Sequence, residues 1–563
     1  MTDTTSVTTT TSTLTNGTTS YTWTSGVSDI DWDTLIEAEV AERTARADSI
    51  DVDISENDVL IESYAQMQDL LATLADAAYL LSAPSGTTNT SYDAFASRAA
   101  YTTASGSVDA DSAVYISVED GTDVGSFDLT IEQLATSHKV AGDAVSSSDE
   151  ALGYDGTFSL QLGDGEAVEI TVDADMTLEE IAEAINTESG TSSVQASVVK
   201  VSDDSYQLVI YGTETGQDLT LASTSGDDVL TGLGVVDSEG AFGHELQAAQ
   251  NAIITYDGIT VTRSSNDIDD LIDGVTLNLY ETTGDETISV EISEDADEIK
   301  DAILGLAEAY NAYREWALTQ QETSTSGEAS SDAALFGDAT LRSTNSAVYS
   351  ALSTVIDDDS MALLGLSYDE SNYLVLDEDV LNDALLNSMD EVKALLSFQM
   401  TSSSSDLSLL AHDNNGNLSF TLDIAADENG SLSVSVDGDD SLFVVSGTRI
   451  KGAEGTIYEG LTFVYLGDGN ESIDVTTTSG IAEALYSTAN AISDDVDGTL
   501  QTLIDDLEDE NETLQTRSDD IRTRAETYRD ALTLRYANYQ ASIEATESTL
   551  DYLEALLQAM YSS

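Results

Sequence analysis

The chain has 563 residues, with 107 acidic side chains against 17 basic ones and a formal net charge of -90. Single cores rarely grow past roughly 250 residues, so several domains are expected. The 41% of hydrophobic residues can give each domain a core. A surface this acidic repels phosphate backbones and anionic headgroups, which argues against binding to nucleic acid or membranes. The scarcity of lysine resembles proteins of halophilic organisms, and like-charge repulsion suits saline surroundings.

The composition also excludes several kinds of chemistry. There is no cysteine, which removes disulfides, thiolate catalysis and zinc-cysteine sites. The three histidines, His138, His244 and His412, are isolated, and no zinc-protease, nucleophile-elbow, P-loop or dinucleotide motif is present. No apolar run reaches the roughly 18 residues of a membrane span, and the N-terminus lacks the basic and apolar regions of a cleavable signal. We therefore expect no enzyme activity, no cofactor and no bound metal.

Clusters of Asp, Asn and Gly at turns are candidates for calcium-binding sites. The stretch GDDVLTGLG at residues 226–234 is similar to one haemolysin-type calcium repeat. Such repeats need neighbours with which to share ions, and here there is one. Turn chemistry is the interpretation that we favour for these clusters.

The N-terminal region begins with a Thr/Ser-rich tail over residues 1–27, predicted to be disordered. Ser28 is a candidate N-cap, and an apolar series with steps of three, four and seven predicts a coiled-coil helix over 28–83, ending near Pro84. The candidate interface residues on this helix are Ile36, Val40, Ile54, Ile61 and Leu71.

The C-terminal region, residues 481–563, shows a stronger coiled-coil pattern. From Leu532 the apolar steps alternate between four and three, and the four-four step centred there is a stutter. Asn511 and Ser518 occupy polar positions of the same seam. Since a helix this long cannot bury its stripe against itself, it needs the N-terminal helix, a neighbouring subunit, or both. The candidate interface residues are Leu514, Ile521, Tyr528, Leu532, Tyr536, Tyr539, Ile543, Leu550, Leu553 and Leu557.

Arginines concentrate in the same helix. Five of the chain's twelve lie within residues 517–535, which makes that stretch nearly neutral. This distribution predicts a contact surface. Ordinary intrahelical pairs, such as Asp520 with Arg524, explain it equally well.

The middle of the chain alternates between strand-like and helix-like patterns. Thr177 and Glu180 are spaced as a capping box at the start of a short helix inside the first β-rich block. The expected fold class is α+β multidomain, with terminal helices forming a coiled-coil leg and antiparallel β-rich head domains inserted between them. The expected segments are 84–125, a linker and the start of the leg domain; 126–293, β-rich head domains; 294–405, a helical leg domain with a Ser-rich loop at 322–332; and 406–480, an extra β-rich insertion.

Together these stretches resemble the flagellar filament capping family, hook-associated protein 2. The resemblance is carried by the helix SGVSDIDWDTLIEAEV, the flagellin-type signature DADMTLEEIAEAINTESGTSSVQASVV, the segment LAEAYNAYREW and the terminal RAETYRDALTLRYANYQASIEATESTLDYLEALL. The most specific block joins Asn266 to the run Asp273-Gly274-Val275-Thr276-Leu277. The family-motif residues are Asn266, Gly274, Val275 and Leu277.

The resemblance implies a function that the residues alone leave open. It implies a ring of five or six copies at the extracellular filament tip, where β domains form a plate, helical legs reach into the filament, and flagellin folds and inserts. It also implies type III export without a cleavable signal and an export chaperone at the C-terminal helix. The long tail and the 406–480 insertion depart from the family pattern. Two alternatives stay open: an exported surface adhesin that uses the β domains, and a hook-filament junction protein.

Overall fold

The computed structural model shows an α+β multidomain chain in which long helices near the two ends of the sequence precede and follow antiparallel β-rich modules. The chain forms two compact units, one of Met1–Ala78, Leu304–Val380 and Ser479–Ser563, the other of Tyr79–Ile303 and Leu381–Thr478. The expected fold class is thereby confirmed. The residues that the structure describes are 11–16, 19–24, 31–82, 93–356, 358–412, 416–427, 431–467 and 469–561.

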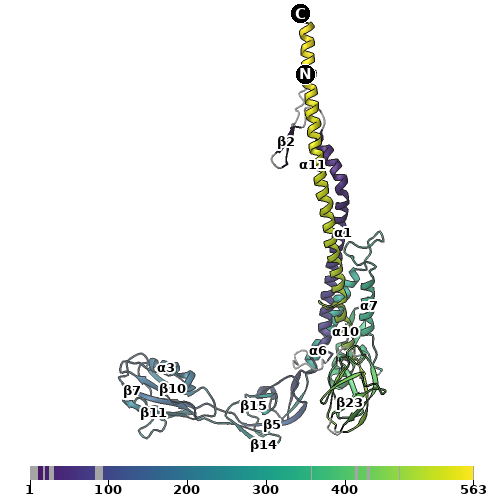
Figure 1. Cartoon of the computed structure of the whole chain (residues 1–563). Helices are drawn as coiled ribbons and strands as arrows, with labels where there is room; N and C mark the ends of the chain where they lie inside the picture. The colour runs from purple at the N-terminus through teal and green to yellow at the C-terminus, as the bar shows by residue number, and fades with distance from the viewer. Residues whose placement is uncertain are drawn as a thin grey trace. The chain divides into compact units, whose positions relative to one another are not determined.

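The first unit is built on an antiparallel pair of long helices, α1 (Trp32–Tyr79) and α11 (Thr499–Tyr561). Figure 1 shows the yellow α11 running beside the purple α1 and continuing past its first residue. The carboxylate of Asp31 caps α1 by accepting hydrogen bonds from the backbone N–H (3.1 Å) and hydroxyl (2.7 Å) of Thr34. The cap therefore lies three residues later than the expected Ser28, which is outside the described residues, as is Pro84.

Shorter elements complete this unit. The expected helix over 481–563 is divided into α10 (Ile481–Ser493) and α11, because the Asp494 carboxylate accepts the backbone N–H groups of Val496 and Asp497 in the intervening turn. α10 packs against α7 (Ala339–Leu352). The other elements are α6 (Ala296–Thr319), of which Leu304 onward belongs to this unit; η2 (Met361–Leu364); the hairpin β18 (Leu366–Tyr368) and β19 (Leu374–Leu376); and the start of α8 (Glu378–Asn387).

The first β module of the second unit has two antiparallel sheets, ordered β14-β13-β5-β17-β3 and β15-β16-β4. β3 and β4 pair with β17 and β16, far along the chain, so residues 98–118 belong to this module and not to the leg as expected. Their inward side chains share one core. The elements are β3 (Arg98–Ala104), α2 (Ala110–Ala113), β4 (Val114–Val118), β5 (Gly125–Gln133), β13 (Ala252–Tyr256), β14 (Ile259–Arg263), β15 (Asp267–Ile272), β16 (Val275–Leu279) and β17 (Ile288–Glu294).

The second β module packs the helix α3 (Leu178–Thr187) onto sheets ordered β12-β6-β10-β9 and β11-β7-β8. The predicted capping box is confirmed, since the Thr177 side chain accepts the Glu180 N–H and the Glu180 carboxylate accepts the Thr177 N–H. The other elements are β6 (Lys139–Ala141), β7 (Gly156–Leu162), β8 (Val168–Val172), α4 (Ser189–Ser192), β9 (Val194–Ser202), β10 (Ser205–Gly212), β11 (Leu219–Gly226), α5 (Val229–Gly232) and β12 (His244–Gln247).

The third β module contains the region of the predicted insertion. Its two four-stranded sheets, ordered β20-β27-β22-β23 and β21-β26-β25-β24, enclose an aromatic-rich core. The module begins slightly before the expected residue 406. Its strands are β20 (Gln399–Ser402), β21 (Leu407–Ala411), β22 (Leu418–Ala426), β23 (Leu432–Ser435), β24 (Phe443–Ser446), β25 (Arg449–Gly452), β26 (Thr462–Tyr465) and β27 (Glu471–Thr478), and α9 (Met389–Leu396) precedes them.

Two described segments of the N-terminal tail, for which the sequence predicts disorder, form strands. β1 (Thr11–Asn16) and β2 (Thr19–Thr24) form an antiparallel hairpin with Asn16 opposite Thr19. The sequence accounts for the strands, because threonine and aromatic residues have a high strand propensity. The rest of the predicted tail lies outside the described residues.

Candidate interface on the paired terminal helices

One end of the α1–α11 pair is anchored by an aromatic contact. The indole of Trp32 stacks on Tyr536 at a ring-centroid distance of 4.9 Å, and its Nε1–H donates to Gln540 Oε1 at 3.0 Å. Ile36 and Leu532 are buried in the same region. This contact fixes the first turn of α1 against α11, because a buried Trp gains both apolar contact and a satisfied N–H.

Two tyrosines hold one carboxylate in the next part of the pair. The hydroxyls of Tyr528 and Tyr536 donate to Glu39 at 2.7 and 2.9 Å. The hydrogen bond from Tyr528, then that from Tyr536, lowers the pKa of Glu39, and nearby arginines act in the same direction. The guanidinium of Arg43 lies 3.6 Å from the centre of the Tyr528 ring. The predicted stutter thus coincides with two tyrosines that reach the same acidic side chain.

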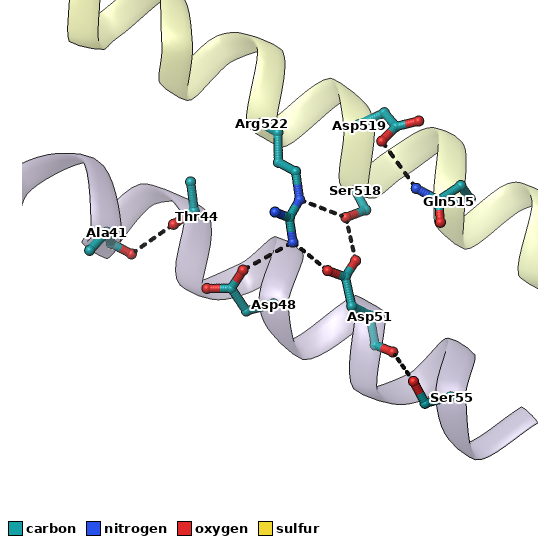
Figure 2. A network of polar contacts seen from close by, with 9 residues as sticks. All are labelled: Ala41, Thr44, Asp48, Asp51, Ser55, Gln515, Ser518, Asp519 and Arg522. Carbon is teal, nitrogen blue, oxygen red and sulfur yellow. Dashed lines mark hydrogen bonds and ion pairs between the residues drawn. The ribbon is translucent and has the colours of Figure 1, made fainter. Parts of the chain in front are cut away.

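Arg522 forms the centre of a polar network across the pair (Figure 2). Its Nη2 contacts Asp48 Oδ1 at 3.0 Å and Asp51 Oδ2, while Asp51 Oδ1 accepts the Ser518 hydroxyl at 2.7 Å. Figure 2 shows the side chains of Ser518 and Arg522 on one helix meeting those of Asp48 and Asp51 on the other. Ser518, a polar seam position in the sequence, therefore bonds to the partner helix.

Amide side chains link the helices further along. Asn57 Nδ2 donates to Asn511 Oδ1 at 3.0 Å, and Asn511 Nδ2 donates to Asp58 Oδ1 at 2.8 Å. Gln68 Nε2 donates to Gln501 Oε1 at 3.2 Å. These contacts specify the axial register, because a slip of one heptad leaves the amide groups without these partners.

Both interpretations of the arginine-rich stretch hold in part. Arg522 pairs with α1, and Arg529 Nη2 lies 3.9 Å from Glu37 Oε1 of α1. Arg524 instead pairs with Asp520 of its own helix at 3.8 Å, as the intrahelical interpretation predicted. The stretch is therefore a contact surface within the chain and also carries an exposed intrahelical pair.

The predicted interface residues differ in how deeply the structure buries them. Figure 1 shows α11 lying beside α1 and then continuing past the end of α1, and Trp32 at the start of α1 contacts Gln540 of α11. Ile36, Leu71 and Leu532 are buried, and Val40, Ile54, Ile61, Leu514, Ile521, Tyr528, Tyr536 and Ile543 are half-buried. Tyr539, Leu550, Leu553 and Leu557 are exposed, Leu550 by 56%.

The family-motif residues stabilise the first β module. Asn266 clamps Ala135 by accepting its N–H at 2.7 Å and donating to its carbonyl at 2.9 Å. Gly274 adopts a φ of +73°, and a Cβ there would lie 2.3 Å from Thr122 Oγ1. Val275 and Leu277 are buried in the core. These positions therefore support the fold of the module.

The candidate cation site has a structural explanation. Asp228 caps the short helix α5 by accepting the Thr231 N–H, and hydrogen bonds from Ser223 and Thr231 lower its pKa. Within the described ranges, no group of three or more His, Asp or Glu side chains is arranged to hold a metal ion. Among those same residues, none of the helices combines the length and apolar composition needed to cross a bilayer.

Several contacts of this pair were not predicted from the sequence. Trp32, Glu39, Asp51 and Asn57 all contact α11 through polar or aromatic groups, yet the apolar periodicity passes over them. These partners can be found from the sequence numbering, because in an antiparallel helix pair the numbers of two contacting residues add up to a nearly constant value. One correct partner pair, such as Asn57 with Asn511, would have indicated the others.

The N-terminal and C-terminal regions of the chain match models of the same protein family. Residues 28–138 match the family model for the N-terminus of flagellar hook-associated protein 2, and residues 249–548, more than half of the chain, match the model for its C-terminus. Residues 157–228 match the flagellin hook IN motif. The predicted resemblance is thereby confirmed over most of the chain.

Individual relatives agree with this match. The B-type flagellar hook-associated protein 2 of Pseudomonas aeruginosa is 28% identical over 280 residues, which are 46% of this chain and 59% of that protein. Its counterpart in Salmonella typhimurium is 34% identical over 254 residues, or 42% and 52% of the two chains. This chain thus spans about half to three fifths of these relatives. A crystal structure of the D1-D2-D3 domains of the flagellar cap protein FliD from Escherichia coli is 26% identical and covers 60% of this chain and 90% of that one, with a TM-score of 0.43.

Proposed function

Because the chain belongs to the flagellar hook-associated protein 2 family, we propose that it is a structural cap at the tip of a bacterial flagellar filament. In this proposal five or six copies form an extracellular ring that promotes the folding and insertion of flagellin during filament growth. Motility depends on this role, and no catalysis is needed for it. The match of both terminal regions to one family carries the proposal and favours it over an adhesin or a junction protein.

The paired helices support a role in docking. α11 continues beyond α1 with Leu550, Leu553 and Leu557 exposed by 56%, 49% and 51%. Leucines spaced by three and four residues form an apolar stripe on one face of the helix. An exposed apolar stripe of this kind is typical of a surface that packs against a partner. In the proposed cap this end of α11 contacts neighbouring subunits or flagellin, and before assembly it binds an export chaperone.

The test replaces one of these leucines in a strain that lacks the chromosomal gene. Leu550→Asp places a charge in the exposed stripe, and we expect short or absent filaments together with loss of the ring in electron micrographs of protein purified in about molar salt. The matched control is Val444→Asp on β24 of the third β module, where the side chain is 60% exposed. Normal filaments are expected from this control.

Two results would contradict the proposal. A strain that lacks the gene and still grows full filaments has no need of this protein as a cap. A purified chain that stays monomeric at high salt and micromolar concentration does not form the ring. Loss of attachment to surfaces with normal filaments would instead indicate an adhesin.

A further inference from the structure

A cavity of about 500 Å³ lies beside the first turn of α7 in the first unit. Arg314 of α6 and Arg342 of α7 both line it, and the buried side chains of Leu335 and Leu341 give it apolar walls. Phe336, which is 47% exposed, also lines it. Such a mixture of apolar walls and a few charged groups is typical of a site that binds a side chain of a partner.

Among the described residues, the hydrogen bonds of the two arginines go to backbone oxygens. Arg314 Nε donates to the carbonyl of Ser371 at 3.0 Å, and Arg342 Nη1 donates to the carbonyl of Gly337 at 2.5 Å. Over the described residues, neither guanidinium forms an ion pair with a carboxylate. Each has five N–H donors, so most remain available. In a chain with 107 acidic residues, two such arginines on one cavity indicate a carboxylate ligand from outside it.

Asp338, the acidic residue among the described lining residues of the cavity, is already engaged. Asp338 accepts the backbone N–H of Leu341 at 2.7 Å as the cap of α7, and it also accepts the Tyr64 hydroxyl at 3.1 Å. Burial, with Asp338 nearby, raises the pKa of Tyr64 to about 12, so the tyrosine stays a donor. Asp338 is therefore committed to the fold, and the cavity keeps a net positive charge.

The exposed end of α11 has the complementary chemistry. Glu547, Leu550, Glu554 and Leu557 are spaced by three, four and three, which places them on one face of the helix. The chain contains no basic residue after Arg535, so every charged side chain at this end of α11 is acidic. Its exposed leucines match the apolar walls of the cavity, and its carboxylates match the two guanidinium groups.

The chain cannot bring these two surfaces together within one molecule. The cavity residue Asp338 bonds to Tyr64 of α1, and one turn further along α1 Gln68 bonds to Gln501 at the start of α11. Leu550 lies 49 residues beyond Gln501 in the same continuous helix, which at 1.5 Å per residue is about 70 Å. A helix that stays straight over this length cannot return to its own cavity.

We propose that this cavity binds the acidic, leucine-bearing end of α11 from a second copy of the chain. Leu550 enters between Leu335 and Leu341, while Glu547 and Glu554 pair with Arg314 and Arg342. The proposal rests on the self-association of the proposed cap and assigns a specific pair of surfaces to it. The contact joins the cavity of one copy to the end of α11 of the next copy. Because each copy carries both surfaces, the contact can repeat and link several copies into a ring.

The absence of cysteine from the sequence allows a direct test. Full-length Phe336→Cys and Leu553→Cys variants carrying different tags are mixed under oxidising conditions at about 0.5 M salt. A disulfide between the two chains is expected, because the proposed contact brings these positions close together. The control replaces Leu553→Cys by Val59→Cys on α1, where the side chain is 51% exposed, and should give at least tenfold less product.

Charge reversal identifies the groups responsible. Arg314→Glu with Arg342→Glu on the cavity chain should reduce the disulfide yield at least tenfold, and Glu547→Arg with Glu554→Arg on the other chain should restore it. Circular dichroism of each variant checks that the fold is kept, and a variant that fails this check is replaced by Arg314→Gln with Arg342→Gln, for which at least threefold loss is expected. Equal yields from the cavity and control positions, or a yield unaffected by the charge changes, would overturn the inference. If wild-type chains still form a ring, the proposed cap survives that result, whereas a strictly monomeric wild type contradicts both.

Discussion

The same substitution at two leucines of α11 should produce two different defects. Leu532 is fully buried against α1, whereas Leu550 on the same helix is 56% exposed. Replacing a buried Leu by Ala removes apolar contact and leaves a cavity, at a cost of about 2–5 kcal/mol. We expect about 2–3 kcal/mol for Leu532→Ala, because a groove between two helices can partly collapse. Leu550→Ala should change the stability of the helix pair by less than about 0.5 kcal/mol.

Hydrogen exchange of full-length protein measures the first effect. In Leu532→Ala, the free energy of opening measured by exchange of the backbone amides of α1 near Ile36 and of α11 near Leu532 should fall by about 2–3 kcal/mol. The amides of the β modules should keep their protection from exchange. Sedimentation at high salt measures the second effect, with weaker self-association expected for Leu550→Ala. Helix propensity cancels from the comparison, since both changes are Leu to Ala in a helix.

Two results would refute this reasoning. Equal exchange rates in Leu532→Ala and the wild type would show that Leu532 does not hold α11 against α1 in solution. A Leu550→Ala protein with a destabilised helix pair and normal association would show that the exposed end serves the fold of the chain itself.

Three further predictions concern polar contacts. The pKa of Glu39 lies below its ordinary value of 4.5, so its ionised form adds stability that is complete above that value and is lost as pH falls through the lowered pKa. Glu39→Gln should therefore destabilise the helix pair at pH 7, and the difference from wild type should vanish in acid. Amide hydrogen exchange measured as a function of pH tests this. Arg522→Ala should cost about 0.5–1 kcal/mol, since its partners are partly exposed, and a double-mutant cycle with Asp51→Asn measures the coupling. Asn266→Ala leaves both backbone groups of Ala135 without their partner and should destabilise the first β module by about 1–3 kcal/mol, seen as faster exchange in β5 and β16 but not in α1.

The sequence predicted the elements of this fold better than their partners. Apolar periodicity located both terminal helices, and the spacing of Thr177 and Glu180 identified a cap that the structure contains. Periodicity carries no information on which strand pairs with which. The sequence pattern therefore predicts that β3 and β4 belong to the linker and the start of the leg, although they pair with strands that follow more than 150 residues later.

The register of the terminal helices illustrates the same limit. A seam of repeating Leu, Ile and Ala residues is compatible with several axial positions, each one heptad apart. The contacts of Asn57 with Asn511 and of Asp51 with Ser518 distinguish between these positions. A geometry-dependent hydrogen bond of this kind has no periodic signature, so the sequence indicated the polar positions but not their partners.

The scarcity of basic residues determines how the helix pair responds to salt. Several interface carboxylates accept hydrogen bonds from uncharged donors: Glu39 from two tyrosine hydroxyls, Asp58 from the amide of Asn511, and Asp51 from the hydroxyl of Ser518 in addition to its ion pair with Arg522. Salt screens repulsion among the acidic surface groups, with a screening length that falls from about 8 Å at 0.15 M to about 3 Å at 1 M. Hydrogen bonds from neutral donors lose little under the same conditions, whereas ion pairs weaken.

Added salt should therefore stabilise the α1–α11 pair, although salt normally weakens helix pairs held by ion pairs. Raising potassium chloride from about 0.15 M to 1 M should slow amide exchange in both helices. In Tyr528→Phe, which removes one neutral donor to Glu39, the exchange rate should be higher at both salt concentrations and should fall by the same factor between them. Faster exchange of the wild type at 1 M would mean that ion pairs such as Arg522 with Asp48 outweigh the repulsion of the acidic surface, contrary to the charge distribution of the chain.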